Sequence, residues 1–190
     1  MEQNGGQFEK LADVALQELR RVFDKMNGEE VEPFLQEILN ARRVFLLSAG
    51  REGLATRAFA MRLMHLGFRA YWIWDDTTPA IGPGDVLLCA SGSGDTGHEL
   101  YICRRAREAG ARILLVTACD TGSARQLADT ALKIPAAAYR AQGDFVPTQQ
   151  CMGNLFEQAL FLFFDVASML LAQRMGVTPQ QMEQRHRNVE

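Results

Sequence analysis

The chain has little of what several classes of protein require. Its 190 residues carry a formal net charge of -3, so there is no basic excess for binding a nucleic-acid backbone. It contains only three histidines and four cysteines, widely spaced and without a Cys-x-x-Cys pair, which argues against a metal site and a disulfide framework. We therefore expect no nucleic-acid partner, no metal, and buried free thiols in a cytoplasmic protein.

Signals for secretion or membrane insertion are also missing. The start, Met1 to Gly5, has neither the basic nor the apolar region of a signal peptide. The most apolar stretch, Ala159–Ala172, is too short to cross a bilayer and contains Asp165. We expect this stretch to form a core or subunit-interface helix, and we expect no membrane partner.

Apolar residues make up 47% of the chain and recur as short runs separated by helical patterns. Strands are predicted at Val44–Leu47, Ala70–Trp74, Val86–Ala90, Ile113–Val116 and Ala131–Ile134. Helices are predicted at Phe8–Met26, Val31–Leu39, Leu54–Leu66, 96–108, Ser123–Ala128, 153–175 and after Thr178-Pro179. Unbroken apolar strands that alternate with helices indicate a parallel sheet covered on both faces. We expect one α/β domain over 1–190, a flavodoxin-like three-layer sandwich with a five-stranded parallel sheet. The N-terminal helices lie in 1–40, the sheet core in 41–135 and the C-terminal helices in 153–190.

The most informative segment is 87–96, Leu-Leu-Cys-Ala-Ser-Gly-Ser-Gly-Asp-Thr. It predicts a buried strand, a Ser/Gly loop and then a helix that begins at Thr96. Glycines, Gly92 among them, let the backbone close around a ligand, while Ser91, Ser93 and Thr96 offer hydroxyls beside the first helical amides. No Gly-Lys-Ser/Thr or Gly-x-Gly-x-x-Gly pattern is present, so the loop suits a phosphate monoester such as a sugar phosphate. A plain strand-to-helix turn with Thr96 as N-cap is the alternative.

A second loop follows the first predicted strand and contains Gly50. In parallel sheets, ligands bind beyond the carboxyl ends of the strands, where the connecting loops gather. We therefore expect Gly50 and the Ser91–Thr96 loop to face one pocket.

Four segments resemble the sugar isomerase (SIS) domain family. They are 59–68 (Phe-Ala-Met-Arg-Leu-Met-His-Leu-Gly-Phe), the Ser-Gly-Ser-Gly loop with Thr96, 152–158 (Met-Gly-Asn-Leu-Phe-Glu-Gln) and Arg-His-x-Asn at 185–188. The loop alone indicates only a SIS domain, whereas the other segments resemble the 6-phospho-3-hexuloisomerases of the ribulose monophosphate pathway. The resemblance implies an isomerase without metal or redox cofactor, which interconverts 3-hexulose 6-phosphate and fructose 6-phosphate through a cis-enediolate.

Three residues in these segments are candidates for proton transfer. The resemblance makes Glu157, one turn into a helix among apolar neighbours, the base that moves a proton between C2 and C3. Without the resemblance, Glu157 is interpreted as a carboxylate that complements the helix dipole. The resemblance makes His186 a proton shuttle supplied by a neighbouring subunit, although alone it is interpreted as part of a solvated tail. His65 is the third candidate, with capping of a helix C-terminus as its alternative role.

The sequence departs from the family at Glu52. The family usually has Gly-x-Gly-Arg-Ser-Gly after its first strand, where this chain has Ser-Ala-Gly-Arg-Glu-Gly at 48–53. We expect the Glu52 carboxylate to weaken binding of a phosphate dianion by repulsion, unless it pairs with Arg51 or Arg57 or points away. Arg51 can clamp the substrate or pair with Glu52. His98 is expected to be a solvated surface residue.

Three functions stay open at this point: the hexulose-phosphate isomerase, an isomerase of a different sugar phosphate, and a non-catalytic sugar-phosphate sensor. In each case the small-molecule partner is a sugar phosphate. The last long helix and the N-terminal helices carry more apolar residues than one sheet can cover. The family forms dimers and tetramers with shared sites, so we expect a homotetramer or at least a homodimer.

Overall fold

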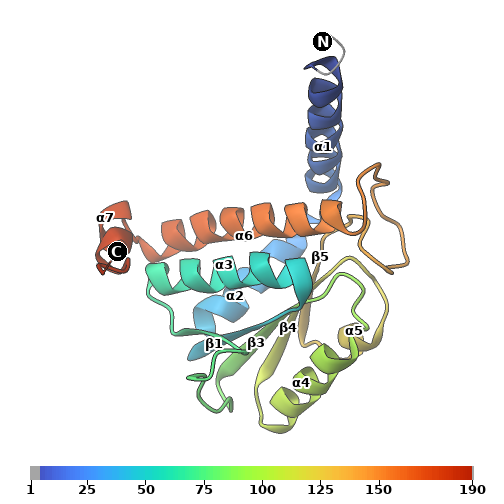
Figure 1. Ribbon diagram of the computed structural model, residues 1–190. Coiled ribbons are helices and arrows are strands. Elements are labelled where there is room, and N and C mark those ends of the chain that lie inside the picture. Colours follow the sequence, from blue (N-terminus) through green and yellow to red (C-terminus); the bar gives the residue numbers. More distant parts are fainter. Residues whose placement is uncertain (1–4, 190) are drawn as a thin grey trace.

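The computed structural model describes residues 5–189, which form a parallel sheet with helices on both faces (Figure 1). The strands are β1 (Arg43–Leu47), β2 (Ala70–Trp72), β3 (Asp85–Ala90), β4 (Arg112–Thr117) and β5 (Thr130–Lys133). The helices are α1 (Gly5–Lys25), α2 (Val31–Asn40), α3 (Gly50–Leu66), α4 (Gly97–Glu108), α5 (Ser123–Leu127), α6 (Asn154–Met175) and α7 (Pro179–Gln184), with a 3-10 turn η1 (Gly28–Glu30). The predicted α/β sandwich is confirmed; the expectation for the residues before Gly5 lies outside the described part of the chain.

The strand order is β2-β1-β3-β4-β5, and all neighbouring strands are parallel. The order reverses between β1 and β3, which pair directly through Leu47 and Cys89 near their carboxyl ends. In open α/β sheets, the crevice beside such a reversal is the usual ligand site, because the two following connections leave toward opposite faces. The segments that leave β1 and β3 here are the Gly50 loop and the Ser/Gly loop.

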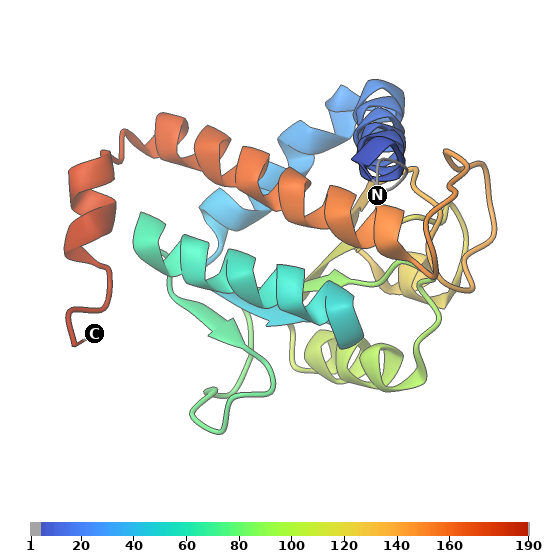
Figure 2. The same ribbon diagram turned by 45° about the horizontal axis from the view of Figure 1, so that its top comes forward.

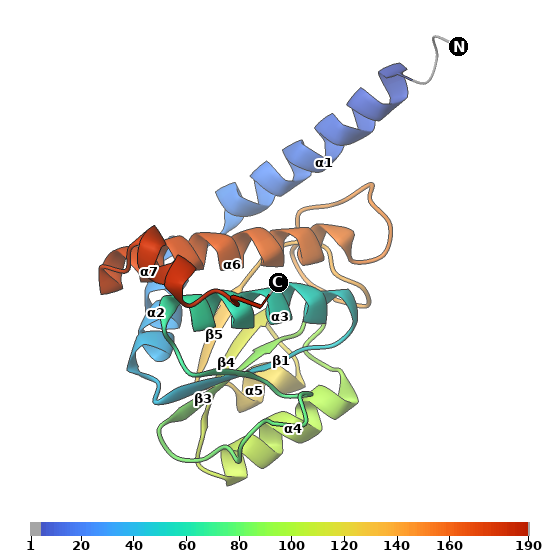
Figure 3. The ribbon, with the colours of Figure 1, turned by 60° about the vertical axis from the view of Figure 1, so that its left-hand side comes forward.

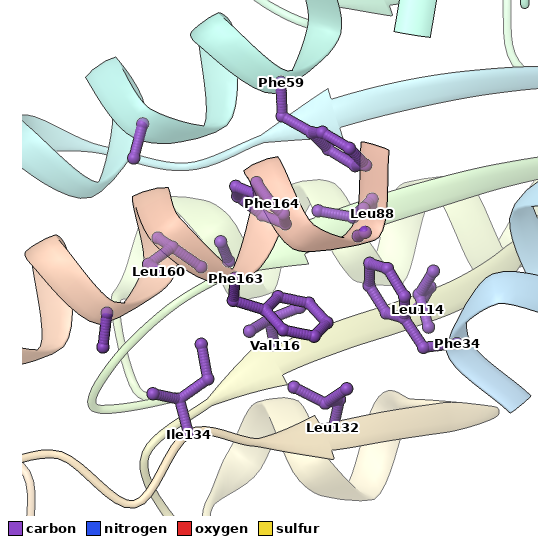
Figure 4. Close-up of a cluster of buried hydrophobic side chains, with 14 of the residues drawn as sticks. Phe34, Phe59, Leu88, Leu114, Val116, Leu132, Ile134, Leu160, Phe163 and Phe164 are labelled. Atoms are coloured by element: carbon purple, nitrogen blue, oxygen red, sulfur yellow. The ribbon is translucent and has the colours of Figure 1, made fainter. Parts of the chain in front are cut away.

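Two layers of helices bury the sheet. Helices α2, α3 and α6 cover one face, with α3 and α6 side by side, and α4 and α5 cover the other (Figures 1 and 2). The larger core lies under α3 and α6, where the rings of Phe59 and Phe164 stack at 4.3 Å and those of Phe34 and Phe163 meet edge-on at 5.1 Å (Figure 4). Fully buried aromatic pairs of this kind add to the apolar area that they remove from water. The core therefore fixes α3 and α6, whose N-terminal ends carry Arg51 and Glu157.

Helix α6 is long and apolar enough to cross a membrane by length and composition, but half of its most apolar window is buried inside the protein. It packs along α3, as a core helix does (Figure 2). Its outer face leaves Phe161, Leu162, Val166 and Met169 exposed. The expectation of a core or interface helix accordingly fits its packing.

Several element boundaries differ from the predicted ones, most of all at the start of α3. Helix α3 begins at Gly50, four residues before the predicted start, so Arg51 and Glu52 lie in its first turn. Strand β2 ends at Trp72, because the chain turns back there and the Thr78 hydroxyl donates to the Trp72 carbonyl at 2.7 Å. At the C-terminus the predicted Thr178 N-cap is confirmed: its side chain and that of Gln181 form a reciprocal capping box.

Helix α1 leaves the body of the protein at an angle, so that only its C-terminal part packs against the rest (Figure 3). Val22 is fully buried there, while Phe8, Leu11 and Leu16 near the free end are 60–72% exposed. Glu18 is buried as well and accepts hydrogen bonds from Thr148, Gln149 and Gln150. These bonds tie α1 to the loop that leads into α6.

Candidate active site

The two predicted loops line one cavity of about 530 Å³ at the carboxyl edge of the sheet. Three parts of the chain surround it, and the lining residues are Ala49, Gly50, Arg51, Glu52, Ser93, Asp95, Thr96, Gly97, Glu99, Tyr139, Arg140, Met152, Gly153 and Glu157. The prediction that Gly50 and the Ser/Gly loop face one pocket is therefore confirmed. Its position beside β1 and β3 follows from the strand order.

The Ser/Gly loop is held in place from below. The Ser91 amide donates to the Val116 carbonyl at 2.9 Å, and the Gly92 carbonyl accepts from the Ala118 amide at 3.2 Å. Only glycine fits at position 92, since an added Cβ would lie 2.7 Å from the Ala138 Cβ and 3.1 Å from a Phe156 ring carbon. Gly94 adopts a φ of +68°, which favours glycine for a different reason. The loop geometry is thus set by packing and leaves little freedom to move.

The hydroxyls of the loop divide between surface and interior. Ser93 and Thr96 line the cavity, whereas Ser91 is 2% exposed beneath it. Thr96 occupies the N-cap position of α4 with extended backbone, but its side chain makes no capping hydrogen bond to the helix. The first amides of α4 therefore lack that side-chain partner at the edge of the cavity, which suits an anion.

Arg51 and Glu157 both line the cavity and contact each other there. The Arg51 Nε lies 2.9 Å from the Glu157 Oε2, so the first turns of α3 and α6 are joined by an ion pair. Arg57 instead pairs with Asp75 at 3.2 Å. The suggested pairing of Glu52 with Arg51 or Arg57 is therefore wrong, because each arginine forms its ion pair with a different carboxylate.

Glu52 points at the Ser/Gly loop. Its Oε2 accepts a hydrogen bond from the Gly92 amide at 2.9 Å, so the carboxylate is neither paired nor turned away. Burial raises the pKa of Glu52 to about 7, against the lowering effect of the Gly92 hydrogen bond, and the nearby Glu99 and Glu157 carboxylates raise it further.

Sequence reasoning missed Glu99, in the first turn of α4. It is 2% exposed and lines the cavity, and its Oε2 has no hydrogen-bond partner within residues 5–189. Burial raises the pKa of Glu99 as well, although Ser91 and Thr96 partly offset this by hydrogen bonding. A glutamate at a helix start is typical of an exposed residue that complements the dipole, so the sequence held no signal of this burial.

The third part of the lining comes from 139–153, which lies almost entirely between the last predicted strand and the helix predicted at 153–175. Arg140 and Met152 adopt positive φ angles of 61° and 56°, and both line the cavity. The Arg140 guanidinium lies 5.0 Å from the centre of the Tyr139 ring. Non-glycine residues in the left-handed region cost free energy, and they gather where the surrounding structure holds them for function. Arg140 adds a positive charge that the sequence pattern did not single out.

His65 and His186 lie together at the opposite end of α3. Their rings stack with centres 5.1 Å apart, and the Arg185 guanidinium donates to the His65 carbonyl at 3.0 Å. Helix α3 ends at Gly67, which makes the cap itself, so His65 has no capping role. At 1.5 Å per residue, His65 is about 20 Å along α3 from Glu52. Within one chain the structure therefore does not bring the two histidines to Glu157.

The sequence analysis also made predictions for His98, for the cysteines and for metal binding. His98 is exposed, as expected, with its ring 5.9 Å from that of Trp74. Cys89, Cys103 and Cys119 are buried free thiols, but Cys151 is exposed, because the loop before α6 runs over the surface. Within residues 5–189, no three His, Cys, Asp or Glu side chains are grouped so as to hold a metal ion.

A parallel α/β sheet with a hydroxyl-bearing glycine loop at its switch point is typical of one class of protein, which binds small anionic ligands beyond the ends of two such strands. Residues 37–156 match the SIS domain, so the chain belongs to the SIS domain family. The resemblance drawn from the sequence is thereby confirmed.

Within the SIS domain family, the chain is similar to several proteins that are named as isomerases of one sugar phosphate. The chain is 39% identical over 166 residues to the 3-hexulose-6-phosphate isomerase of Mycobacterium gastri, covering 87% of this chain and 83% of that protein. It is 32% identical over 175 residues to the enzyme of the same name from Bacillus subtilis, covering 92% and 95%. A hypothetical protein from Methanococcus jannaschii, whose crystal structure infers a molecular function of 3-hexulose-6-phosphate isomerase, superposes with a TM-score of 0.81 at 27% identity, covering 95% and 99%.

Proposed function

We propose that this chain is a sugar-phosphate isomerase that interconverts 3-hexulose 6-phosphate and fructose 6-phosphate. The observation that carries the proposal is that Glu157 and the Ser/Gly loop line the same cavity. A proton acceptor and an anion site in one cavity are what this isomerisation needs, because the phosphate anchors one end of an open-chain sugar. The names of the relatives at 39% and 32% identity support the same reaction.

The reaction moves one proton between neighbouring carbons without any change in composition. Glu157 removes the proton from C2 of the 3-ketose. The electron pair of that C–H bond forms the C2–C3 double bond, and the π pair of the C3 carbonyl moves onto O3, which gives a cis-enediolate. A proton then passes between O2 and O3, and Glu157 returns its proton to C3 to give the 2-ketose. One carboxylate serves as base and then as acid, so no redox cofactor or metal takes part.

Arg51 orients the base. Its Nε holds the Glu157 Oε2 at 2.9 Å, which leaves the other carboxylate oxygen for the sugar carbon. The guanidinium also adds positive charge next to the enediolate as negative charge develops there. Ser93 and Thr96 in the lining of the cavity, with the buried Ser91 and Gly92 next to them, are our candidates for holding the phosphate, and Arg140, which also lines the cavity, can assist.

His65 and His186 enter this scheme only from a second copy of the chain. They lie about 20 Å from the cavity along α3 of their own chain. Apolar side chains are exposed along α3: Leu54, Met61 and Met64 line a groove of about 440 Å³ on α3 and β2. Patches of this kind mark interfaces. We infer a homotetramer, or at least a homodimer, in which His186 of one copy shuttles the proton in the cavity of another.

A mixing experiment tests this arrangement. Glu157→Gln subunits and His186→Ala subunits should each be inactive in a coupled fructose 6-phosphate assay, and mixed oligomers should regain part of the activity. No recovery in oligomers shown to be mixed would place both groups in one site or remove one of them from the mechanism. Buried free thiols at Cys89, Cys103 and Cys119 suit the reducing cytoplasm, where we expect the enzyme to work.

The four carboxylates in the cavity favour one variation on this proposal. Glu52, Asp95, Glu99 and Glu157 outnumber Arg51 and Arg140 in its lining. An isomerase of a different sugar phosphate, with more donor groups than fructose 6-phosphate, would suit such a wall. A thermal-shift panel of sugar phosphates distinguishes the two, since the true substrate should raise the melting temperature most.

A further inference from the structure

The backbone donor that a phosphate would use in the Ser/Gly loop already has a partner within the protein. Glu52 Oε2 accepts the Gly92 N–H at 2.9 Å, and Glu52 Oε1 lies 2.8 Å from where a Cβ on residue 92 would stand. The carboxylate thus rests directly against the loop backbone. Amides of glycine loops are the donors that bind anionic oxygens in such sites. Glu52 and an incoming phosphate ester therefore compete for one donor.

A second buried carboxylate makes this arrangement unfavourable when both are charged. Glu99 enters the same cavity from α4 with 2% exposure, and its Oε2 has no hydrogen-bond partner in the described residues. An unpaired buried carboxylate oxygen costs free energy, which a proton or a donor from a ligand would relieve. A proton or a ligand donor placed near Glu52 and Glu99 would therefore be stabilising.

Several elements surround Glu52 with titratable or charged groups: Arg51 on α3, Cys89 on β3, Asp95, His98 and Glu99 at the start of α4, Arg140 after β5 and Glu157 on α6. The two arginines are engaged elsewhere, Arg51 with Glu157 and Arg140 over the Tyr139 ring. In the described part of the chain, no cation forms an ion pair with Glu52. A phosphate dianion brought to the loop would meet an uncompensated carboxylate.

We propose that a phosphate ester binds at the Ser/Gly loop together with one proton, which Glu52 takes up. The proton comes from solvent and forms an O–H bond on the carboxylate; no bond of the ligand breaks. Neutral Glu52 no longer repels the phosphate and has an O–H that donates to a phosphate oxygen, while the Gly92 N–H becomes free to donate as well. This inference rests on the proposed function for the identity of the ligand, a sugar phosphate.

The proton is available near neutral pH. Burial and the carboxylates of Glu99 and Glu157 raise the pKa of Glu52 to about 7, so about half of the ligand-free protein carries it at that pH. Above pH 7 the ligand-free protein must first gain the proton, and the apparent affinity falls about tenfold for each further pH unit. A phosphate monoester itself ionises near pH 6, so the ligand contributes little change above pH 7.

The test compares the unaltered protein with Glu52→Gln, which keeps the size of the side chain but cannot ionise. Calorimetric titration with fructose 6-phosphate from pH 6 to pH 9 should show affinities within a fewfold of each other at pH 6. The unaltered protein should bind about tenfold more weakly than the variant at pH 8 and about a hundredfold more weakly at pH 9. Titrations at pH 8 in buffers of different ionisation enthalpy should show uptake of about one additional proton by the unaltered protein.

Two further measurements make the result unambiguous. Glu99→Gln removes one negative neighbour, so it should move the pH midpoint of binding downward without abolishing it. A ¹³C NMR titration of the Glu52 carboxyl without ligand should show a midpoint near 7, and a midpoint near 4.5 would overturn the inference.

The binding data also separate this inference from the proposed function. A ratio of affinities that does not change with pH, or weaker binding by Glu52→Gln at every pH, overturns the proton-coupled binding but leaves an active isomerase standing. Absence of binding and of turnover with fructose 6-phosphate in both proteins overturns the proposed function, and this inference with it.

Discussion

Replacing Glu52 by glutamine should stabilise the ligand-free protein at alkaline pH. The folded protein raises the pKa of this carboxyl from 4.5 to about 7, because it is buried against the Gly92 backbone beside Glu99 and Glu157. Between these two values the folded state holds a proton that the unfolded state has released, so the free energy of unfolding falls as the pH rises. At about 1.4 kcal/mol for each tenfold change in proton affinity, the loss between pH 5 and pH 8 is about 2–3 kcal/mol.

Urea unfolding at pH 5 and pH 8 measures this loss. Glu52→Gln should match the unaltered protein at pH 5 within about 1 kcal/mol and exceed it by about 2–3 kcal/mol at pH 8, since an amide is never charged. Glu9→Gln, on the exposed side of α1, is the matched control and should change nothing at either pH. A Glu52→Gln difference that is the same at both pH values would show that Glu52 ionises like a solvated carboxyl, and would refute the electrostatic reasoning about the cavity.

Three other variants test the site and its support. Gly92→Ala should abolish sugar-phosphate binding in calorimetry and lower stability by about 1–3 kcal/mol, since its Cβ would clash with Ala138 at 2.7 Å; Gly28→Ala, with open space around it and outside the cavity lining, should do neither. Ser93→Ala should weaken binding by about 1.5–3 kcal/mol, and an unchanged affinity would place the phosphate elsewhere. Asp85→Asn should lower the free energy of unfolding by about 2–4 kcal/mol at pH 7, because Arg42 and Arg43 lose a buried carboxylate. The two arginines hold the pKa of Asp85 well below its usual range, so the charged carboxylate stabilises the folded protein above about pH 4. The variant should lack this pH-dependent part of the stability. Chemical denaturation at pH 7 and pH 2 checks the last of these, because the contribution of Asp85 is lost only below about pH 4, and equal stabilities at pH 7 would contradict it.

Much of the fold follows from local patterns in the sequence. Unbroken apolar runs such as Val86–Ala90 are typical of strands buried on both faces, and β3 is buried along its whole length. The parallel arrangement then places the Gly50 and Ser/Gly loops at one edge, as observed. The start of α3 was missed because Gly-Arg-Glu-Gly favours a loop, whereas the helix begins there with Gly50 at a φ of +56°.

The electrostatics of the site depend on contacts between distant residues, which no local pattern encodes. Glu52 accepts a hydrogen bond from the Gly92 amide, 40 residues further along the chain. Arg51 forms an ion pair with Glu157 on another helix. Glu99 is buried only because α4 starts beneath the loop that follows β1. The approach of His186 to His65 depends on how α7 folds back on α3. Sequence reasoning reached the residue types of the site but not their partners.

The central claim is that Glu157 moves the proton between the sugar carbons, and hydrogen exchange at C3 of fructose 6-phosphate tests it most directly. The protein is incubated with fructose 6-phosphate in D₂O, and loss of the C3 proton signal, at the carbon that is deprotonated to form the enediolate, is followed by ¹H NMR. Glu157→Gln should still bind the sugar phosphate but exchange about 10²–10⁴ times more slowly, because an amide cannot accept the proton. Asp165→Asn, an exposed carboxylate on the same helix, should exchange at the unaltered rate. Exchange by Glu157→Gln at the rate of the unaltered protein would contradict the account.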